Sequence, residues 1–309
     1  MERIGRRELE GMAAACGLDD AAAAPARPVP VDAASWDARV AGYPADLGYL
    51  ARGAARRLDP DLVLPGVRSM VVAAVSYATA APGAEALPPG HVFVSRHAWC
   101  LDYHRTVGER MERLAAAIAG ATGARTRWYV DTGPVPEKAW AAAAGLGFVG
   151  RNGLLIHPRL GSFAFLGAVL TDAEVEGRTP VPDGCGSCRA CADACPARAL
   201  PRPYELDASR CAAFLNAACR SPVSADLLPG LASNLYGCDL CQDACPWNRR
   251  ADRPAREEFR PLPGLHLPAV ADVLALGEEG VRALFAPTAG HRRDPRLVLD
   301  VASRLAGGV

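Results

Sequence analysis

Lysine is nearly absent from this chain, and neither charge sign is in excess. Lys138 is the one lysine among 34 basic residues, which we attribute to the coding bias of the source. The 34 basic residues balance 34 acidic ones, which argues against a strongly basic nucleic-acid-binding protein but leaves room for a local positive patch. With 309 residues, 50% of them hydrophobic, the chain is long enough for two modest domains with a sizeable core.

Long apolar runs and nucleotide-binding motifs are also missing. No stretch approaches the roughly 18 apolar residues of a membrane-spanning helix, and the first ten residues mix both charges where a secretory signal would be apolar. Arg6 and Arg7 are followed by acidic residues rather than by the apolar run of a twin-arginine signal. Neither G-x-G-x-x-G after a strand nor G-x4-G-K-[ST] occurs, so NAD or nucleoside triphosphate binding has no motif support. We expect a cytoplasmic protein without a membrane partner.

Cysteine, in contrast, is abundant. In a cytosolic chain, 11 cysteines point to metal binding rather than to disulfides. Eight of them fall in two runs and the segment between. The first run, residues 185–196, reads C-x2-C-x2-C-x3-C-P, the bacterial ferredoxin pattern for a [4Fe–4S] cluster. The second, residues 238–246, repeats the last three cysteines and the proline and is one ligand short.

Cys211 lies between the runs and supplies the missing thiolate, so eight ligands serve two clusters. In two-cluster ferredoxins the cysteine before proline ligates the other cluster. The predicted sets are therefore Cys185, Cys188, Cys191 and Cys245 for one cluster, and Cys195, Cys211, Cys238 and Cys241 for the other. A pair of zinc sites is the alternative, because C-x2-C also suits tetrahedral zinc. The leftover thiols, expected to be small buried apolar residues, are Cys16, Cys100 and Cys219.

The region before the cysteines has the pattern of a mixed α/β domain. Strands are predicted over residues 69–77, 125–130 and 162–170, and helices over residues 102–120 and 136–145. Strands that alternate with helices suggest a layered sheet. A joint rich in proline and glycine precedes the cysteines, and a tail with helix signal around residues 268–285 follows them. The predicted domains are residues 1–177, 178–250 and 251–309.

Short motifs across residues 45–290, taken with the eight cysteines, resemble those of epoxyqueuosine reductases. The motifs are Leu64-Pro-Gly-Val-Arg-Ser69, Ser95-Arg96, Asp102-Tyr-His104, Asp131-Thr-Gly-Pro134, the run 144–152, Gly161-Ser-Phe163, Leu170-Thr-Asp172 and Tyr236-Gly-Cys-Asp239. The resemblance implies an α+β fold: a nitroreductase-like or reductive-dehalogenase-like cobalamin-binding domain, a two-cluster ferredoxin-like module and a short helical tail. Before this resemblance is considered, His104 is equally well explained as a structural or as a catalytic residue.

The family resemblance also implies an activity. Members are cytoplasmic, cobalamin-dependent iron–sulfur enzymes related to reductive dehalogenases. They perform the last step of queuosine biosynthesis, the reduction of the cyclopentane epoxide of epoxyqueuosine in tRNA. Removal of an epoxide oxygen takes two electrons and two protons; two [4Fe–4S] clusters can supply the electrons, and base-off cobalamin the bond cleavage. We expect a monomer served by an external flavodoxin- or ferredoxin-like donor.

The same resemblance implies the site residues. Asp131 matches the family's acid and would need a pKa raised by burial from about 3.9 to donate a proton near neutral pH. Its alternative role is a turn-forming aspartate before Thr-Gly-Pro. Positions that surround the corrin ring in the family are matched by Arg57, Ser95, Leu155 and Leu166, with Asp131 among the cofactor contacts. The two leucines would otherwise be core residues.

The tail departs from the family, whose members commonly carry a basic stretch there that helps to hold tRNA. Residues 251–309 contain eight Arg and eight Asp or Glu. Because phosphate contacts supply much of nucleic-acid affinity, a positive surface must then be local, and the candidates are Arg292, Arg293 and Arg296. Two alternative functions are a cobalamin and iron–sulfur reductase of a small epoxide or organohalide, and an electron-transfer protein of the ferredoxin type.

Overall fold

A computed structural model of the chain describes residues 3–307 and separates into two compact units. The first unit contains the residues up to Ser76 together with His104–Gly186, and the second contains Tyr77–Tyr103 together with the residues from Ser187 on. Residues 77–103 therefore group with the cysteine-bearing segment and the tail. The three predicted domains stay a prediction, and their outermost residues, 1–2 and 308–309, lie outside the described residues.

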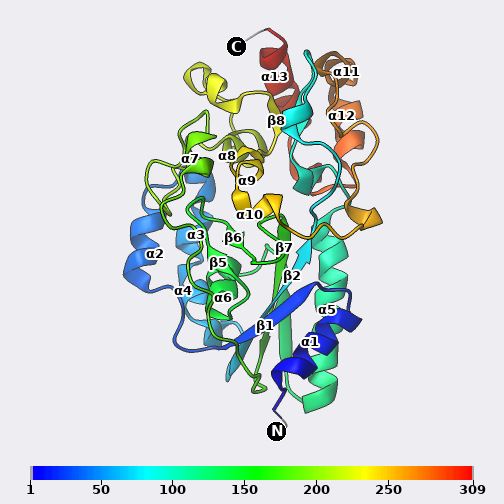
Figure 1. The fold of residues 1–309 in the computed structure, drawn as a ribbon. Helices are drawn as coiled ribbons and strands as arrows, with labels where there is room; N and C mark the ends of the chain where they lie inside the picture. Colours follow the sequence, from blue (N-terminus) through cyan, green and yellow to red (C-terminus); the bar gives the residue numbers. More distant parts are fainter. Residues whose placement is uncertain (1–2, 308–309) are drawn as a thin grey trace. The chain divides into compact units, whose positions relative to one another are not determined.

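The first unit is built on a four-stranded antiparallel sheet of order β1-β2-β7-β4. Figure 1 labels β1, β2 and β7 of this sheet. The strands are β1 (Asp20–Pro25), β2 (Ser69–Ser76), β7 (Ala164–Thr171) and β4 (Thr126–Tyr129). All eight positions of β2 are buried, as expected for a central strand covered on both faces. A small hairpin pairs β5 (Phe148–Val149) with β6 (Leu155–Ile156).

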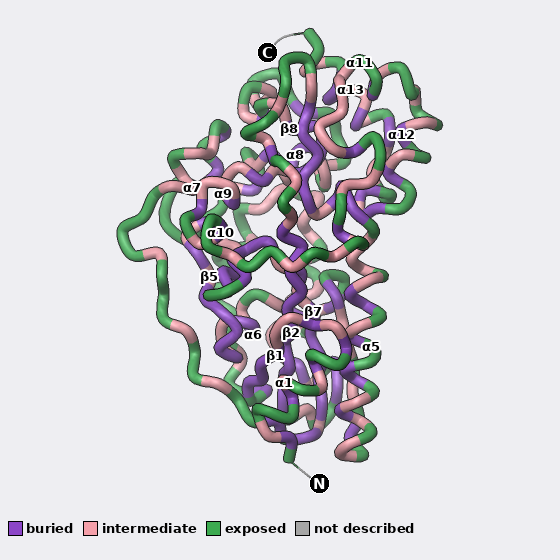
Figure 2. The backbone as a smooth tube through the Cα atoms, turned by 45° about the vertical axis from the view of Figure 1, so that its right-hand side comes forward, coloured by how far each residue is buried: buried purple, intermediate pink, exposed green. Residues whose placement is uncertain are grey.

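Helices cover both faces of this sheet. On one face α6 (Glu137–Ala143) packs its Trp140 against alternate residues of β2, such as Val72. On the other face lies α5 (Tyr103–Thr122), which approaches so closely that a Cβ at Gly167 would lie 2.5 Å from Cγ of Met111. The buried positions run along the central strands in Figure 2. The remaining helices of this unit are α1 (Arg6–Ala15), α2 (Ala33–Val40), α3 (Tyr49–Arg52) and α4 (Ala54–Leu58).

The second unit is mostly helical. Its one sheet among the described residues pairs β3 (Phe93–Val94) with β8 (Asn234–Tyr236) in parallel. Two one-turn helices, α7 (Ala190–Asp193) and α9 (Leu240–Asp243), form within the two cysteine runs and contact each other. The others are α8 (Ala212–Ala217), α10 (Pro246–Arg249), α11 (Val270–Ala275), α12 (Gly277–Phe285) and α13 (Pro295–Ala306).

The residues of the tail group with this second unit. Helix α13 packs against α8, β8, α11 and α12. The helix predicted around residues 268–285 is divided into α11 and α12 at Gly277, whose φ is 61°. Across residues 3–307, none of the helices has the length and apolarity needed to cross a bilayer.

Candidate functional site

One predicted set of cysteines is brought together in the second unit. Burial raises the pKa of Cys241 well above its ordinary value, and the charges of Cys238 and Cys211 raise it further. Burial likewise raises the pKa of Cys238 to about 12, with Cys211 and Cys195 among the neighbours that add to the shift. Buried, crowded thiols hold negative charge only beside a cation, and the iron of a cubane supplies it. The donor chemistry therefore fits a [4Fe–4S] cluster.

The other predicted set is partly visible within the same unit. Burial raises the pKa of Cys191, and the nearby Cys245 and Cys188 contribute. Cys185, the fourth member, belongs to the first unit, where its Sγ accepts a hydrogen bond from the backbone N–H of Arg151 at 3.4 Å. Over the described residues, no group of three or more His, Cys, Asp or Glu side chains is arranged to hold a single metal ion.

The three leftover cysteines lie outside these sets. Cys16 and Cys100 are buried, as expected of small apolar residues. Burial raises the pKa of the Cys100 thiol to about 12, so it is uncharged at neutral pH. Cys219 is only half-buried, and its Sγ donates to the carbonyl oxygen of Ser221 at 3.6 Å.

A buried ion pair lies next to the second cysteine run. Asp239, between Cys238 and Cys241 in the sequence, accepts hydrogen bonds from the backbone N–H and Nη1 of Arg96, both at 3.0 Å. Its second oxygen accepts from Oγ of Ser95 at 2.5 Å. The hydroxyl of Ser95, a predicted corrin contact, is thus engaged inside the second unit.

Asp131 follows β4 in the first unit and has an unusual backbone. Its φ is 57°, and the N–H of Thr132 donates to the carbonyl oxygen of Val130 at 2.6 Å. A hydrogen bond across three residues with positive φ at the centre is the rare form of γ-turn. The Asp131 side chain is 62% exposed, with Oδ2 lying 3.4 Å from Nε2 of His104. The burial expected for this carboxyl is therefore absent, and the group is open to a binding partner.

Two further groups lie near Asp131, and no sequence motif marks either of them. Oε1 of Glu137, the first residue of α6, accepts a hydrogen bond from the Asp131 N–H at 2.8 Å. Burial raises the pKa of Glu137 to about 8, and the Asp131 carboxylate contributes to the shift. Burial and the charge of Asp131 also raise the pKa of Tyr49, while Arg57 opposes them. The guanidinium of Arg57 lies 5.8 Å from the Tyr49 ring centroid. Only their proximity to Asp131 in the fold reveals these groups.

The two predicted leucines lie on the face of the sheet that α6 covers. Leu155 is buried in the apolar cluster that contains Trp140, and Leu166 is half-buried against it. The β4–β7 register ends with Tyr129 opposite Ala168. Asp131 lies two residues after Tyr129, and Leu166 lies two residues before Ala168. Because the strands are antiparallel, both residues lie toward the same end of the sheet. Of the five predicted catalytic and corrin residues, four are in the first unit and Ser95 is in the second.

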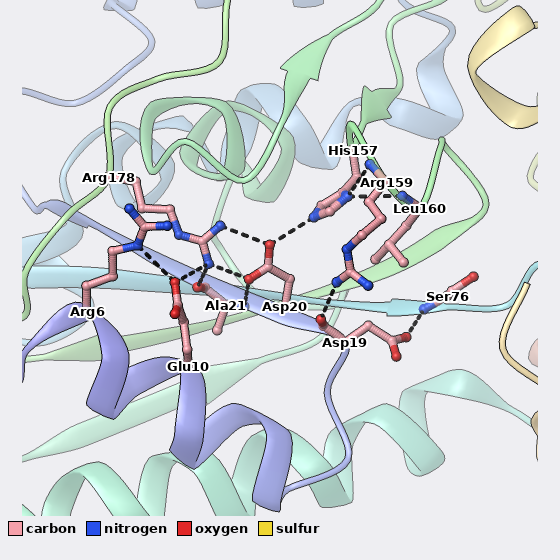
Figure 3. Close-up of polar contacts among 10 residues, drawn as sticks. All are labelled: Arg6, Glu10, Asp19, Asp20, Ala21, Ser76, His157, Arg159, Leu160 and Arg178. Carbon is pink, nitrogen blue, oxygen red and sulfur yellow. Dashed lines mark hydrogen bonds and ion pairs between the residues drawn. The ribbon is translucent and has the colours of Figure 1, made fainter. Parts of the chain in front are cut away.

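A polar network in the first unit holds the segment that leads to Cys185 (Figure 3). Asp20 accepts hydrogen bonds from Arg178 Nη1 at 2.9 Å and from His157 Nε2 at 3.0 Å. Nδ1 of His157 accepts from the backbone N–H groups of Arg159 and Leu160, both at 3.1 Å, so Nε2 carries the proton. Although burial acts in the opposite direction, the bonds from Arg178 and His157 hold the pKa of Asp20 well below its usual range.

The three candidate arginines of the tail differ in what they contact. Arg292 is exposed and donates from Nε to Nε2 of His291 at 3.3 Å. Arg293 donates to the carbonyl oxygen of Cys219 and, at 3.4 Å, to that of Leu215, so its guanidinium supports the fold. Arg296 pairs with Asp294 at 2.7 Å. Arg292 and Arg296 are both exposed, and Arg296 lies beside an acidic partner.

Comparison with known proteins identifies relatives for both parts of the site. A family described as "Epoxyqueuosine reductase QueG, DUF1730" matches residues 57–132. A "4Fe-4S double cluster binding domain" matches residues 184–248, which include all eight predicted ligands. The epoxyqueuosine reductase of Synechocystis sp. is 36% identical over 271 residues, which cover 85% of this chain and 90% of that protein.

Solved structures of epoxyqueuosine reductases also resemble this chain. One, determined with a tRNA-Tyr epoxyqueuosine-modified tRNA stem loop, has a TM-score of 0.84 and 29% identity. Another, from Bacillus subtilis, has its catalytic aspartate loop swung out of the active site and gives a TM-score of 0.83 with 28% identity. Each match covers 96% of this chain and 79% of the solved one.

Proposed function

Because this chain belongs to the epoxyqueuosine reductase family, we propose that it reduces the cyclopentane epoxide of epoxyqueuosine in tRNA to give queuosine. The chain is an iron–sulfur oxidoreductase with a segment for two [4Fe–4S] clusters. The relative solved with a modified tRNA stem loop supports tRNA as the substrate. The observation in this chain that carries the proposal is the exposed carboxyl of Asp131, held in a strained turn beside His104.

Cobalamin is the second cofactor in this proposal. Its contacts in the first unit would be Arg57, Leu155 and Leu166. A corrin ring is broad and apolar with amide groups at its edge. The half-buried Leu166 offers an apolar surface for the ring, and the guanidinium of Arg57 offers hydrogen-bond donors for the amide oxygens. The family match over residues 57–132 spans Arg57, Ser95 and Asp131. When bound, cobalamin supplies the reduced cobalt needed for carbon–oxygen cleavage.

The role proposed for Asp131 is proton donation. Conversion of the epoxide to an alkene consumes two electrons and two protons and releases the oxygen as water. The carboxyl of Asp131 gives one proton to the epoxide oxygen as its bond to carbon breaks, and solvent supplies the other. A bound substrate would desolvate the exposed carboxyl and so raise its pKa toward the range useful for an acid. Electrons enter from an external flavodoxin- or ferredoxin-like donor, and the enzyme acts as a monomer.

A cellular experiment tests the substrate. A bacterial strain that lacks its own epoxyqueuosine reductase should accumulate epoxyqueuosine in tRNA, and expression of this chain should restore queuosine, as measured by mass spectrometry of tRNA nucleosides. Expression of the Asp131→Asn variant is the control and should not restore it. Failure of the wild-type chain, when it is present with both clusters, would favour the alternative of a small epoxide or organohalide substrate.

A further inference from the structure

We propose that Glu137 is a positioning residue that holds Asp131 in its working place: its carboxyl oxygen binds the backbone N–H of Asp131 and keeps the loop after β4 in the strained turn. The inference rests on the proposed role of Asp131 as the acid. It assigns a task to a half-buried carboxyl that the proposed reaction does not otherwise use.

The loop needs such a restraint because its conformation is unfavourable by itself. Asp131 has φ of 57°, where a side chain crowds the backbone, and γ-turns of this form are rare. Its side chain is 62% exposed, so packing of the carboxyl adds little. Two short hydrogen bonds close the turn: Thr132 N–H to the Val130 carbonyl at 2.6 Å and Asp131 N–H to Glu137 Oε1 at 2.8 Å. The second joins the turn to a different element.

Glu137 is a firm support for that bond. It begins α6, and this helix is anchored by Trp140 and Ala141, which are buried in the apolar cluster against the sheet. The carboxyl oxygen of Glu137, fixed on the helix, thus accepts the N–H of Asp131 in the strained loop. In the Bacillus subtilis relative, a catalytic aspartate loop has been seen swung out of the active site. A loop of this kind needs a contact that favours one position, and the Glu137 bond is such a contact for Asp131 in this chain.

The charge around Glu137 suits this task. Burial raises its pKa to about 8, with Asp131 contributing, while the positive charges of Lys138 and His104 act the other way. The carboxyl is therefore mostly neutral at pH 7, where its carbonyl oxygen still accepts the N–H. A neutral acceptor binds the Asp131 backbone without placing a second negative charge beside the Asp131 carboxylate. An amide in place of the carboxyl would do the same.

Hydrogen exchange tests the contact without any need for turnover. In anaerobically prepared holoenzyme, we expect the peptide containing the Asp131 amide to exchange about 10-fold faster in Glu137→Ala than in wild type, by mass spectrometry. Glu137→Gln keeps the acceptor and should exchange like wild type. Glu109→Ala removes an exposed glutamate of α5 that pairs only at the surface with Arg105 and is the matched control. Wild-type exchange in Glu137→Ala, or equally fast exchange in both Glu137 variants, would overturn the proposal.

Turnover then separates this inference from the proposed function. With iron and cobalamin content unchanged, Glu137→Ala should lower kcat about 10-fold and Glu137→Gln should recover most of it. A Glu137→Ala enzyme with fast exchange and full kcat would show that the loop position does not matter for the reaction and would overturn the positioning role. If Asp131→Asn itself stays active while the exchange pattern is as expected, the proposed role of Asp131 fails and the contact with Glu137 stands.

Discussion

Asp131 has a left-handed backbone and a largely exposed side chain. A residue other than glycine in this region of φ is strained by about 1–3 kcal/mol, and such strain gathers at functional sites. Turn aspartates also tolerate this region of φ, so the backbone fits both a turn-forming residue and an acid. The observation that favours the acid is Nε2 of His104, which lies 3.4 Å from the Asp131 carboxyl.

Asp131→Asn should separate chemistry from structure. The amide has the shape of the carboxyl but cannot donate a proton as an acid, so we expect iron and cobalamin to be retained while turnover falls about 100-fold or more, in the range that general acids contribute. Single-turnover kinetics on matched cofactor-loaded samples measures this. A rate near that of the wild type would reduce Asp131 to a turn residue, and loss of cobalamin would make its role structural.

For individual residues, the sequence points to the candidate acid, Asp131, but not to the side chains that surround it. Asp131 could be selected because a family motif carries it. Glu137 and Tyr49 could not, because only the fold brings them near Asp131. Glu137, at the start of α6, accepts the Asp131 N–H, and the charge of Asp131 raises the pKa of Tyr49 in α3. His104 was open between two roles, and its position 3.4 Å from the Asp131 carboxyl favours the functional one.

Among the elements, the cysteine runs were the most predictable because the ligands of a cubane follow a fixed local spacing. The one-turn helices α7 and α9 carry this spacing, and their contact brings the two runs together. Strand β1 was not predicted at all. Its sequence, Asp-Ala-Ala-Ala-Ala-Pro, has no alternation, and alanine favours helix. Pairing of all six residues of β1 with Ser69–Ala74 of β2 overrides that preference.

Cys211→Ser tests the division of ligands between the clusters. The wild-type protein, purified without oxygen, should hold about eight iron and eight sulfide per chain. The variant should lose much of the cluster that also uses Cys195, Cys238 and Cys241, and so approach about four of each. Iron and sulfide analysis with electron paramagnetic resonance measures both. Cys219→Ser is the control. Zinc without labile sulfide in the wild type would end the iron–sulfur assignment.

The network around Asp20 makes a prediction about how β1 and the segment before Cys185 are joined. Asp20→Asn removes the closer of two carboxylates paired with the half-buried Arg178 and leaves Glu10 at 3.4 Å, which should lower stability by roughly 3 kcal/mol. Because the folded pKa of Asp20 is held below its unfolded value of about 3.9, this contribution is fully present above about pH 4 and is lost as the pH falls further.

Thermal unfolding between pH 5 and pH 8 checks this estimate. The difference in Tm between wild type and Asp20→Asn should be several degrees and constant across that range. Asp37→Asn, at an exposed position of α2, should leave Tm unchanged. A difference that disappears as the pH falls from 8 to 5 would mean that a different group, and not Asp20, carries the effect.

For the whole molecule, the family motifs in the sequence predicted the fold class. Composition alone could not have predicted it. Zero net charge argued against a nucleic-acid-binding protein, yet a relative was solved with a tRNA stem loop. Net charge describes the whole chain, whereas phosphate contacts depend on a few local side chains. Of the three candidate arginines in the tail, Arg293 is engaged by backbone carbonyl groups, whereas Arg292 and Arg296 are exposed, Arg296 beside Asp294. Contacts of this kind leave no trace in a count of charges.

The central claim is the reduction of an epoxide in tRNA, and one measurement tests it directly. Protein purified without oxygen, supplied with cobalamin and a strong reductant, is incubated with tRNA that contains epoxyqueuosine, and the nucleosides are analysed by mass spectrometry. We predict conversion to queuosine that depends on cobalamin, reductant and an intact Asp131. Unchanged epoxyqueuosine, with both clusters present and a metabolite-sized epoxide or organohalide reduced by the same sample, would contradict the proposed substrate.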